Sequence, residues 1–369
     1  MKYKILHIFS SYSFGGAEKT TLLLAENLQK SGLCDNIVAV PYGSKLYQEA
    51  FKKNIKLKAF KAANSFDPSA ILRLVKIIKK NNVNILHVHQ GKLYWTALLV
   101  KFLCLNKIKV VFHRRQDTRH SFISKNHYKF VDAVITVSQA VANGLIKYEK
   151  VDVKKIKVVY NGVNFEKFNK NIDYSDIIKA YSLENKKVIG TVSQIVDFMG
   201  KGQIHLMEAA KMLKEEFSDL RYLIVGSGKG LQEQQAYAKK LNVDDIVYFT
   251  GYQDNDNVPK YMLSMDIFCL LAWDTEGMPN VVVEAQSLEK PVIVTNIGGN
   301  TEAFIDGVTG IMVSPKNSVQ VANAIKKLIL NPDIAKQMGR EGKKFVKEKF
   351  VLENTVKNTL EVYEKILRH

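Results

Sequence analysis

The sequence predicts an α/β protein with two Rossmann-like domains that face a central cleft, and three observations favour this fold. The chain has 369 residues, which suits two domains of ordinary size. Short apolar runs alternate with segments of helical periodicity, a pattern typical of parallel sheets covered on both faces. The alternation is interrupted near residues 165–185, where Asn, Asp and Lys accumulate. We therefore expect a first domain over residues 1–170, a linker, and a second domain over residues 186–350.

In the first domain the alternation begins with a short apolar run that leads into a helix-like segment. We predict helices over residues 17–30 and 68–80. The second of these is amphipathic and basic, with four cationic residues between its aliphatic ones: Arg73, Lys76, Lys79 and Lys80. The predicted strands cover residues 4–9, 36–40, 85–88, 110–112 and 133–137.

The second domain repeats the pattern. Its apolar runs are short and bounded by turn residues, as buried parallel strands are. Ligands of such sheets bind outside the carboxyl ends of the strands. The predicted strands cover residues 188–192, 222–225, 247–249, 267–271 and 291–294.

Composition favours a cytoplasmic protein. Cys34, Cys104 and Cys269 lie far apart and match no metal or disulfide spacing, so we expect them to be reduced. The apolar run within residues 1–10 is too short for a signal peptide. The most apolar later stretch, residues 93–112, is interrupted by three lysines, which argues against a transmembrane span.

Positive charge is concentrated in the first half of the chain. Residues 1–170 contain 30 Lys and Arg against 10 Asp and Glu, whereas residues 171–369 contain 24 against 26. A half with this excess is expected to meet an anionic partner, such as a membrane surface, a phosphorylated acceptor or nucleic acid. The alternative is a generally basic, solvated surface.

The most informative motif is Glu276-Gly-Met-Pro-Asn-Val-Val-Val-Glu284, with seven residues between its two carboxylates. Gly277 and Pro279 form turns, and the apolar run leads into a helix whose N-terminus would face a phosphate. Ala285 follows, and then Lys290-Pro-Val-Ile-Val-Thr-Asn-Ile-Gly-Gly299. The whole string resembles the E-x7-E signature of the retaining glycosyltransferases of family 4, which have the GT-B fold.

The resemblance implies a function. A sugar would pass from a UDP- or GDP-sugar to a glycan or lipid-linked acceptor with retention of configuration, in cell-surface polysaccharide or lipopolysaccharide/lipooligosaccharide biosynthesis. It also implies that a final helix near residues 354–367 packs back on the first domain. No Asp or His set in the sequence has convincing metal spacing, so we expect the reaction to need no metal or cofactor. By resemblance, Glu276 lies near the donor sugar and Glu284 holds the ribose hydroxyls. The residues between them would also bind substrate: Gly277, Met278, Pro279 and Asn280.

Three glycine-containing loops follow predicted strands. Gly15-Gly16 can be read as a tight strand-to-helix turn or as a phosphate-approaching loop, and Gly15-Gly-Ala-Glu18 resembles the GG-x-E start of the family. In Gly190-Thr-Val-Ser-Gln-Ile-Val-Asp-Phe-Met-Gly-Lys-Gly202, the resemblance makes Lys201 a clamp for the donor diphosphate. Gln194 stands where the family has an arginine, so the clamp would depend more on Lys201. Gly226 belongs to a G-x-G segment that contacts the nucleotide in the family.

Histidines lie at the ends of two predicted strands of the first domain. His113 matches a family histidine that reaches the donor sugar, although a basic surface cluster with Arg114 and Arg115 is the alternative. The two arginines could grip an acidic or phosphorylated acceptor. His87 and His89 alternate along a strand, which suits a solvated strand end rather than a ligand pair.

Two other functions are considered. A sugar-nucleotide epimerase on the same fold would need its own acid and base and would lack the Glu276 to Glu284 string. A nucleic-acid-binding protein would need aromatic residues among the basic ones, but the basic segments here are Lys and aliphatic, so no nucleic-acid partner is expected. Asp254-Asn-Asp256 resembles a metal-binding DxD motif but reads better as a turn.

We expect peripheral binding to an anionic membrane at the inner face of the cell membrane.

Overall fold

A computed structural model describes residues 3–12, 14–116 and 126–368. The chain divides into two compact units, each with its own sheet. The first contains Met1–Gly162 together with Leu352–His369, and the second contains Val163–Val351. The chain therefore passes twice between the units, once in each direction.

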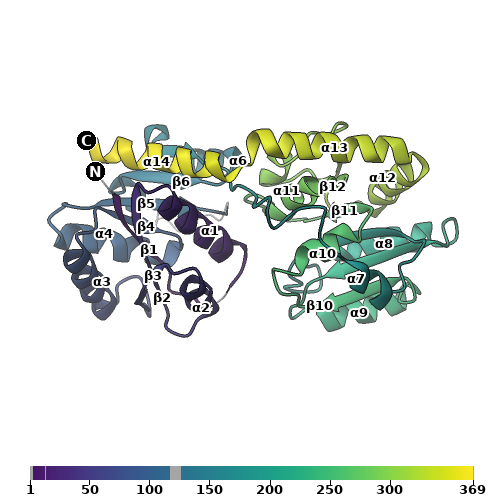
Figure 1. Cartoon of the computed structure of the whole chain (residues 1–369), viewed down its shortest axis with the longest axis horizontal. Helices are drawn as coiled ribbons and strands as arrows, with labels where there is room; N and C mark the ends of the chain where they lie inside the picture. Colours follow the sequence, from purple (N-terminus) through teal and green to yellow (C-terminus); the bar gives the residue numbers. More distant parts are fainter. Residues whose placement is uncertain (1–2, 13, 117–125, 369) are drawn as a thin grey trace. The chain divides into compact units, whose positions relative to one another are not determined.

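The first unit is built on a seven-stranded sheet in which every described pairing is parallel (Figure 1). The strand order is β3-β2-β1-β4-β5-β6-β7, so the chain proceeds outward in one direction from β1 and in the other from β4. This reversal is the switch point of a doubly wound sheet. The strands are β1 (Tyr3–Ile8), β2 (Cys34–Val40), β3 (Lys56–Ala59), β4 (Ile85–Val88), β5 (Lys109–Arg114), β6 (Ala133–Thr136) and β7 (Ile156–Val158).

Helices cover both faces of this sheet because alternate side chains of its strands are apolar on each face. Leu86 and Phe112 point to the face packed by α3 and α4, whereas Ile85 and Val111 point to the face packed by α1 and α14. The helices among the described residues of this unit are α1 (Gly16–Lys30), α2 (Lys45–Lys52), α3 (Pro68–Asn81), α4 (Tyr94–Leu103), α6 (Gln139–Glu149) and α14 (Leu352–Arg368).

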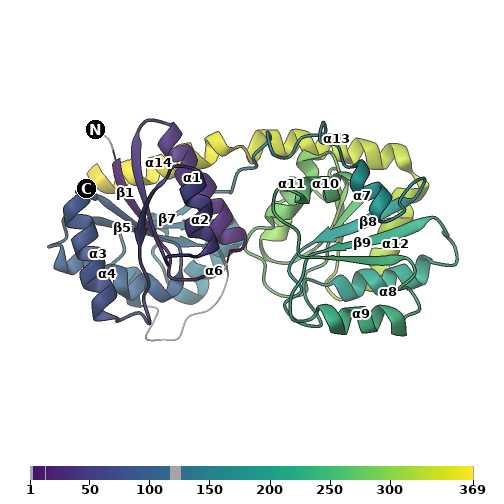
Figure 2. The same ribbon diagram turned by 60° about the horizontal axis from the view of Figure 1, so that its bottom comes forward.

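The C-terminal helix α14 belongs to the first unit, although the chain reaches it after completing the second. It lies beside α1 and β6, as Figures 1 and 2 show. Its buried residues, among them Val362, Tyr363 and Ile366, join the core formed by Leu24 and Leu28 of α1. The first domain therefore needs the last residues of the chain to complete one of its faces.

The second unit has a six-stranded parallel sheet with the order β10-β9-β8-β11-β12-β13. The reversal of strand order lies between β8 and β11. The strands are β8 (Lys187–Val192), β9 (Leu220–Val225), β10 (Val247–Gly251), β11 (Ile267–Leu270), β12 (Val292–Thr295) and β13 (Gly310–Val313).

One face of the second sheet packs against α8 and α12, whose apolar residues form a single core with β8, β9 and β11. α11 and α13 pack on one another and contact β12 and β13, respectively. The helices are α7 (Ser175–Ala180), α8 (Gln203–Leu213), α9 (Leu231–Lys240), α10 (Val258–Leu263), α11 (Asn280–Ser287), α12 (Ser318–Leu330) and α13 (Pro332–Lys349).

The division of the chain differs from the predicted one in one respect. The polar segment of residues 165–185, expected to be a linker after a first domain of residues 1–170, lies inside the second unit and contains α7. It is tied to that unit by ion pairs, such as Lys167 with Asp256 at 2.8 Å and Lys260 with Asp176 at 2.9 Å. A polar surface segment and a linker have the same composition, so composition did not separate them.

Among the described residues, no helix combines the length and the apolar character needed to cross a bilayer.

Candidate active site

The switch point of the second sheet brings two predicted site residues into contact. Lys201 follows β8 and Glu276 follows β11, and these two strands are neighbours in the sheet. The Nζ of Lys201 lies 2.5 Å from Oε1 of Glu276. Both side chains are only partly exposed, at 35% and 15% respectively. The predicted diphosphate clamp and the predicted sugar-facing carboxylate therefore form one ion pair at the place where such sheets bind ligands.

The loop that carries Lys201 is held by Gln203 at the start of α8. The Lys201 N–H donates to Oε1 of Gln203 at 2.7 Å, and Nε2 of the buried Gln203 donates to Oγ of Ser193 at 2.8 Å. Gly202 adopts a φ of +83°, and a Cβ there would lie 1.9 Å from the carbonyl oxygen of Leu271. The loop is thus packed against the segment after β11. Gln194, by contrast, is exposed.

The loop that carries Glu276 is held through its backbone. The Glu276 carbonyl accepts the N–H of Gly299 at 2.9 Å. Gly298 has a φ of +45°, and a Cβ at that position would lie 2.3 Å from the same oxygen, so a side chain would push the carboxylate loop away. Glycine is required here for close approach rather than for flexibility.

The remaining residues of the motif surround the start of α11. Gly277, Met278 and Pro279 are buried, while Asn280 and Glu284 are half-buried on the helix itself. At the start of α11 the N–H of Asn280 donates to Met278 O at 3.1 Å and that of Val282 to Pro279 O at 3.0 Å, and this turn carries the positive end of the helix dipole. The motif therefore places Glu276 ahead of a helix N-terminus and Glu284 along the helix.

Gly226 lies in the loop after β9, and this loop packs against the loop after β8 in the same unit. Gly226 has a φ of +141°, and a Cβ would lie 2.0 Å from the carbonyl oxygen of Ser193. Hydrogen bonds join the two loops on either side of this contact, from the N–H of Ser193 to Val225 O at 3.0 Å and from that of Ile195 to Ser227 O at 3.1 Å. The predicted nucleotide-contacting and diphosphate-contacting loops are therefore neighbours.

In the first unit, Gly15 and Gly16 stand at the N-terminus of α1, as predicted. The N–H of Gly15 donates to Oε2 of the buried Glu18 at 2.9 Å. This bond is half of a capping box, in which a carboxylate satisfies an otherwise unpaired backbone donor. A phosphate bound by the Gly15 N–H would have to displace this carboxylate.

The histidines of the first domain form one buried cluster on the sheet face covered by α1 and α14. His7 on β1, His87 on β4 and His113 on β5 follow the apolar residues of that face at two-residue intervals, and His89 follows His87 in the same way. Their exposed fractions are 0%, 0%, 3% and 5% for His7, His87, His113 and His89. The interpretation of His87 and His89 as a solvated strand end is therefore wrong, because helices cover this face. A basic surface cluster around His113 is excluded for the same reason.

Hydrogen bonds connect the cluster in two branches. In one, Nε2 of His7 lies 3.2 Å from Oδ1 of Asn36, and Nδ1 of His7 lies 3.0 Å from Nε2 of His89. In the other, Nδ1 of His113 lies 3.2 Å from Nε2 of His87, whose Nδ1 lies 2.6 Å from the Tyr363 hydroxyl. Asn36 and Tyr363 were not predicted. A sequence signal for Asn36 exists, since it is a polar residue in an apolar strand.

Burial disfavours the charged imidazolium and so lowers the pKa of each histidine in the cluster. It lowers the pKa of His7 to about 4, and it holds the pKa values of His87, His89 and His113 well below the ordinary 6.5. The charge of the nearby Arg115 adds to this effect on the pKa of all four. The cluster is therefore neutral at pH 7.

Neither of the two arginines after His113 presents an exposed guanidinium group for bidentate hydrogen bonds to an acceptor. Nη1 and Nη2 of Arg115 donate to the hydroxyls of Thr20 and Thr21 at 2.9 and 2.7 Å. Arg114 is buried, with 6% of its surface exposed. The predicted bidentate grip on an acidic acceptor is wrong for these two positions, because one guanidinium is engaged by α1 and the other is enclosed.

Two groups could be considered for a metal ion. Asp254-Asn-Asp256 lies in and just before a turn ahead of α10, and Asp256 pairs with Lys167. His7, His87 and His89 bring ring nitrogens within 4.8 Å of one another. In the described structure each of these nitrogens also lies within hydrogen-bond distance of a neighbouring side chain, so an ion would have to displace those contacts.

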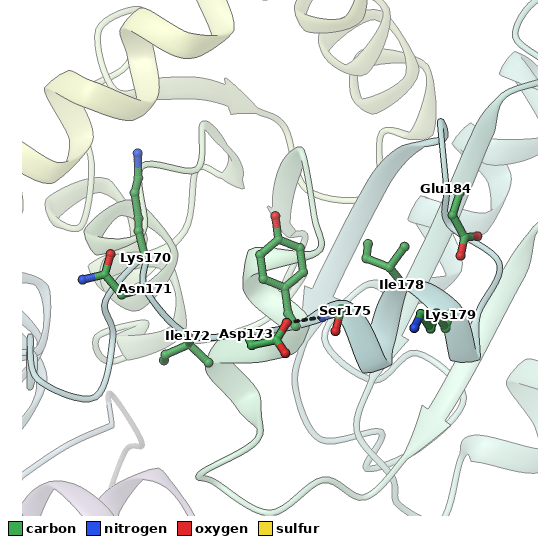
Figure 3. A pocket seen from close by; sticks show the side chains of 9 residues that line it. Lys170, Asn171, Ile172, Asp173, Ser175, Ile178, Lys179 and Glu184 are labelled. Carbon is green, nitrogen blue, oxygen red and sulfur yellow. Dashed lines mark hydrogen bonds between the residues drawn. The ribbon is translucent and has the colours of Figure 1, made fainter.

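A hollow of about 470 Å³ lies elsewhere on the second unit. Figure 3 shows that it is lined by one continuous segment, from Lys170 through α7 to Glu184. Asp173, two residues before the first residue of this helix, accepts the Ser175 N–H at 2.9 Å. None of the predicted site residues lines it, so we assign it no role in the chemistry.

The two halves of the chain match two families of known proteins. Residues 14–167 match the family described as Glycosyltransferase Family 4, and residues 173–345 match the family described as Glycosyl transferases group 1. An uncharacterized glycosyltransferase of Methanocaldococcus jannaschii is 24% identical over 366 residues, covering 92% of each chain. The capsular polysaccharide biosynthesis glycosyltransferase CapM of Staphylococcus aureus is 28% identical over 232 residues, covering 59% of this chain and 57% of its own.

Solved structures agree over the full length. A glycosyltransferase from Rickettsia africae matches with a TM-score of 0.89 and 26% identity, covering 100% of this chain and 99% of its own. Anabaena HepE, solved in complex with UDP-glucose, matches with a TM-score of 0.85 and 20% identity, covering 99% and 100%. The chain is therefore a glycosyltransferase with the GT-B fold, and it belongs to family 4.

Proposed function

We propose that this glycosyltransferase moves a sugar from a UDP- or GDP-sugar to a glycan or lipid-linked acceptor with retention of anomeric configuration. The observation that carries the proposal is the contact between Lys201 and Glu276 at the switch point of the second sheet, 2.5 Å between Nζ and Oε1. The cation and the carboxylate held together there are opposite in sign to the two charges that such a reaction develops. The leaving diphosphate becomes more negative, and the sugar carbon becomes more positive.

The second domain supplies the donor-binding groups in this proposal. Lys201 meets the diphosphate, together with backbone N–H groups at the start of α11. Glu284 holds the ribose hydroxyls, and the loop at Gly226 contacts the nucleotide. The exposed Gln194 replaces the arginine of the family, so it contributes hydrogen bonds to the diphosphate but no charge.

His113 of the first domain contacts the donor sugar, and Glu276 stabilises the positive charge at the reacting carbon. No metal ion enters the proposal, because the charge on the leaving group is met by Lys201 and by N–H groups already held in place. Removing one such preorganised donor typically costs about 3 kcal/mol of transition-state stabilisation.

Named relatives support the donor and the pathway. HepE has been solved with UDP-glucose, which supports a nucleotide-sugar donor. CapM is named for capsular polysaccharide biosynthesis, which supports an acceptor in cell-surface polysaccharide synthesis.

The first domain is proposed to bind the acceptor at the inner face of the membrane. The exposed side of α3 carries Arg73, Lys76, Lys79 and Lys80, while Leu74 and Ile78 face the core. A row of cations on a helix anchored in this way suits reversible binding to anionic lipid.

A donor screen with the purified chain tests the proposal. Melting temperature is measured with UDP, GDP, their sugar conjugates and single-stranded DNA, followed by assays for nucleoside diphosphate release. We expect one nucleotide series to stabilise the chain, and Lys201→Ala to lose most of that shift. Lys211→Ala, which alters an exposed lysine on α8, is the control and should behave as wild type. Stabilisation by DNA alone would contradict the proposal.

A further inference from the structure

Two buried side chains, Tyr363 and His87, connect α14 to His113 through successive hydrogen bonds. The Tyr363 hydroxyl on α14 lies 2.6 Å from Nδ1 of His87 on β4, and Nε2 of His87 lies 3.2 Å from Nδ1 of His113 on β5. Tyr363 and His87 are fully buried, and His113 is 3% exposed. The helix that ends the chain thus reaches a residue assigned to the donor sugar through one intermediate ring.

The available donors and acceptors decide which atom donates in the hydrogen bond between Tyr363 and His87. Burial raises the pKa of Tyr363 well above its usual range, so the phenol keeps its proton. Among the described residues, the recorded hydrogen-bond partner of this hydroxyl is His87. If His87 donated instead, the phenolic hydrogen would be buried without an acceptor, which is unfavourable. The hydroxyl therefore donates to Nδ1 of His87.

The tautomers follow in order, because a neutral imidazole has one donor and one acceptor nitrogen. Burial holds the pKa values of His87 and His113 well below 6.5, so both rings are neutral at pH 7. His87 accepts at Nδ1 and must donate from Nε2. His113 then accepts at Nδ1 and carries its hydrogen on Nε2.

Nε2 of His113 is buried and has no hydrogen-bond partner among the residues that the structure describes. A buried donor left without an acceptor is rare unless a ligand or water completes it. We propose that Tyr363 is a positioning residue which, through His87, fixes His113 in the Nε2–H tautomer, so that His113 donates a hydrogen bond to an oxygen of the bound donor. This rests on the proposed function, which places His113 at the donor sugar.

The chemistry of sugar transfer gives this arrangement a purpose. The reacting carbon gains positive charge as the diphosphate leaves, so an imidazolium beside it would repel the developing charge. A neutral ring with a fixed N–H offers a directed hydrogen bond without adding that charge. The same tautomer cannot act as a general base through Nε2.

The first test reads the tautomer directly and needs no substrate. Nitrogen-15 NMR of the full chain, labelled at histidine, distinguishes protonated from unprotonated ring nitrogens, and His113→Ala and His87→Gln assign the signals. We expect a protonated Nε2 and an unprotonated Nδ1 for His113. Tyr363→Phe should convert this into a mixture of tautomers.

Thr359→Val is the matched control. Thr359 lies one turn earlier on α14 and is fully buried, and its hydroxyl donates to the Thr355 carbonyl of the same helix at 2.7 Å. It should leave the tautomer of His113 unchanged. Melting temperatures of both variants report whether the domain remains folded. A wild-type His113 protonated at Nδ1, or an unchanged tautomer in a folded Tyr363→Phe variant, would overturn the inference.

The second test separates this inference from the function on which it rests. Turnover of UDP-glucose and GDP-mannose is measured for His113→Ala, Tyr363→Phe and Thr359→Val. We expect Tyr363→Phe to lower kcat roughly tenfold with KM for the donor little changed, since an orienting partner rather than a contact is lost. If His113→Ala is as active as wild type, the proposed role of His113 fails, whatever the NMR shows. If His113→Ala is inactive and Tyr363→Phe has the wild-type kcat, only the positioning role of Tyr363 fails.

Discussion

Lys201 and Glu276 lie in contact, with Nζ 2.5 Å from Oε1, although they belong to loops after different strands of the second sheet. In the proposed function, a diphosphate that approaches Lys201 would compete with Glu276 for the ammonium group and would leave the carboxylate free to face the sugar. The pair would thus be exchanged for two separate contacts when the donor binds.

Glu276→Gln should lower turnover by on the order of 10² or more, because the carboxylate acts mainly on charge that develops in the transition state. Its effect on folding should be small, since the side chain is partly exposed and the backbone contact with Gly299 is kept. Steady-state kinetics and melting temperature check both points. Glu215→Gln, an exposed change on the same domain, serves as the control. Wild-type turnover in Glu276→Gln would remove the proposed role.

Chelation with EDTA should leave activity largely intact. Lys201 and helix-end N–H groups meet the leaving group in our account, and Asp256 is engaged by Lys167 in a turn. The measurement is turnover before and after dialysis against EDTA, with manganese or magnesium then added back. Loss of activity that either ion restores would show that Asp254 and Asp256, or the histidine cluster, hold a metal after all.

The first domain should bind vesicles that contain anionic lipid, and salt should weaken the binding. Each Lys or Arg close to such a surface contributes about 1 kcal/mol, and the attraction fades over a Debye length of roughly 8–10 Å. The measurement is co-sedimentation at low and high salt. The test variant changes four exposed cations of α3 to Gln together: Arg73, Lys76, Lys79 and Lys80.

A matched variant removes the same number of exposed cations from the second domain by changing Lys211, Lys239, Lys240 and Lys336 to Gln. It should sediment nearly as the wild type does, because the excess of positive charge lies in the first half of the chain. Equal sedimentation of the α3 variant and the wild type at both salt concentrations would mean that this helix face is only solvated.

Acid should destabilise the first domain before the second. The pKa of His7 is lowered to about 4 in the folded state, and those of His87, His89 and His113 are also lowered, whereas an unfolded histidine titrates near 6.5. Below pH 6.5 the unfolded chain binds protons that the folded cluster does not. The free energy of unfolding therefore falls by about 1.4 kcal/mol per pH unit for each such histidine until the folded pKa is reached.

The two tryptophans make this measurable. Trp95 lies in the first domain and Trp273 in the second, so Trp273→Phe and Trp95→Phe each leave a probe of one domain. Denaturant unfolding is followed between pH 7 and pH 5. The second domain, which contains the single histidine His205, should depend less on pH in this range. Equal slopes for the two domains would contradict the assignment of neutral, buried histidines.

The sequence placed the central strands well because they are buried on both faces and read as continuous apolar runs. The runs at 267–271 and 291–294 correspond to β11 and β12 within one residue at each end. The edge strands β3, β7 and β13 were missed. β3 reads Lys-Leu-Lys-Ala, and such a short alternation of charged and apolar residues does not distinguish an edge strand from a loop.

The site was predictable in part. The motif around Glu276 and the loop around Lys201 were found by resemblance, but their ion pair depends on β8 and β11 being neighbours, which the strand order of the folded sheet decides. The burial of His87 and His89 was not predictable from their alternation, because alternation fixes a shared face and not what covers it. Tyr363 covers that face from the end of the chain, and local sequence gives no sign of it.

Retention of anomeric configuration is the most direct test of the account. With the donor that the screen identifies, NMR of the product during the reaction reports the configuration of the new anomeric centre. We predict that the product keeps the configuration of the donor sugar, and that Glu276→Gln forms the same anomer more slowly. An inverted product, or no sugar transfer from any UDP- or GDP-sugar, would contradict the proposed function.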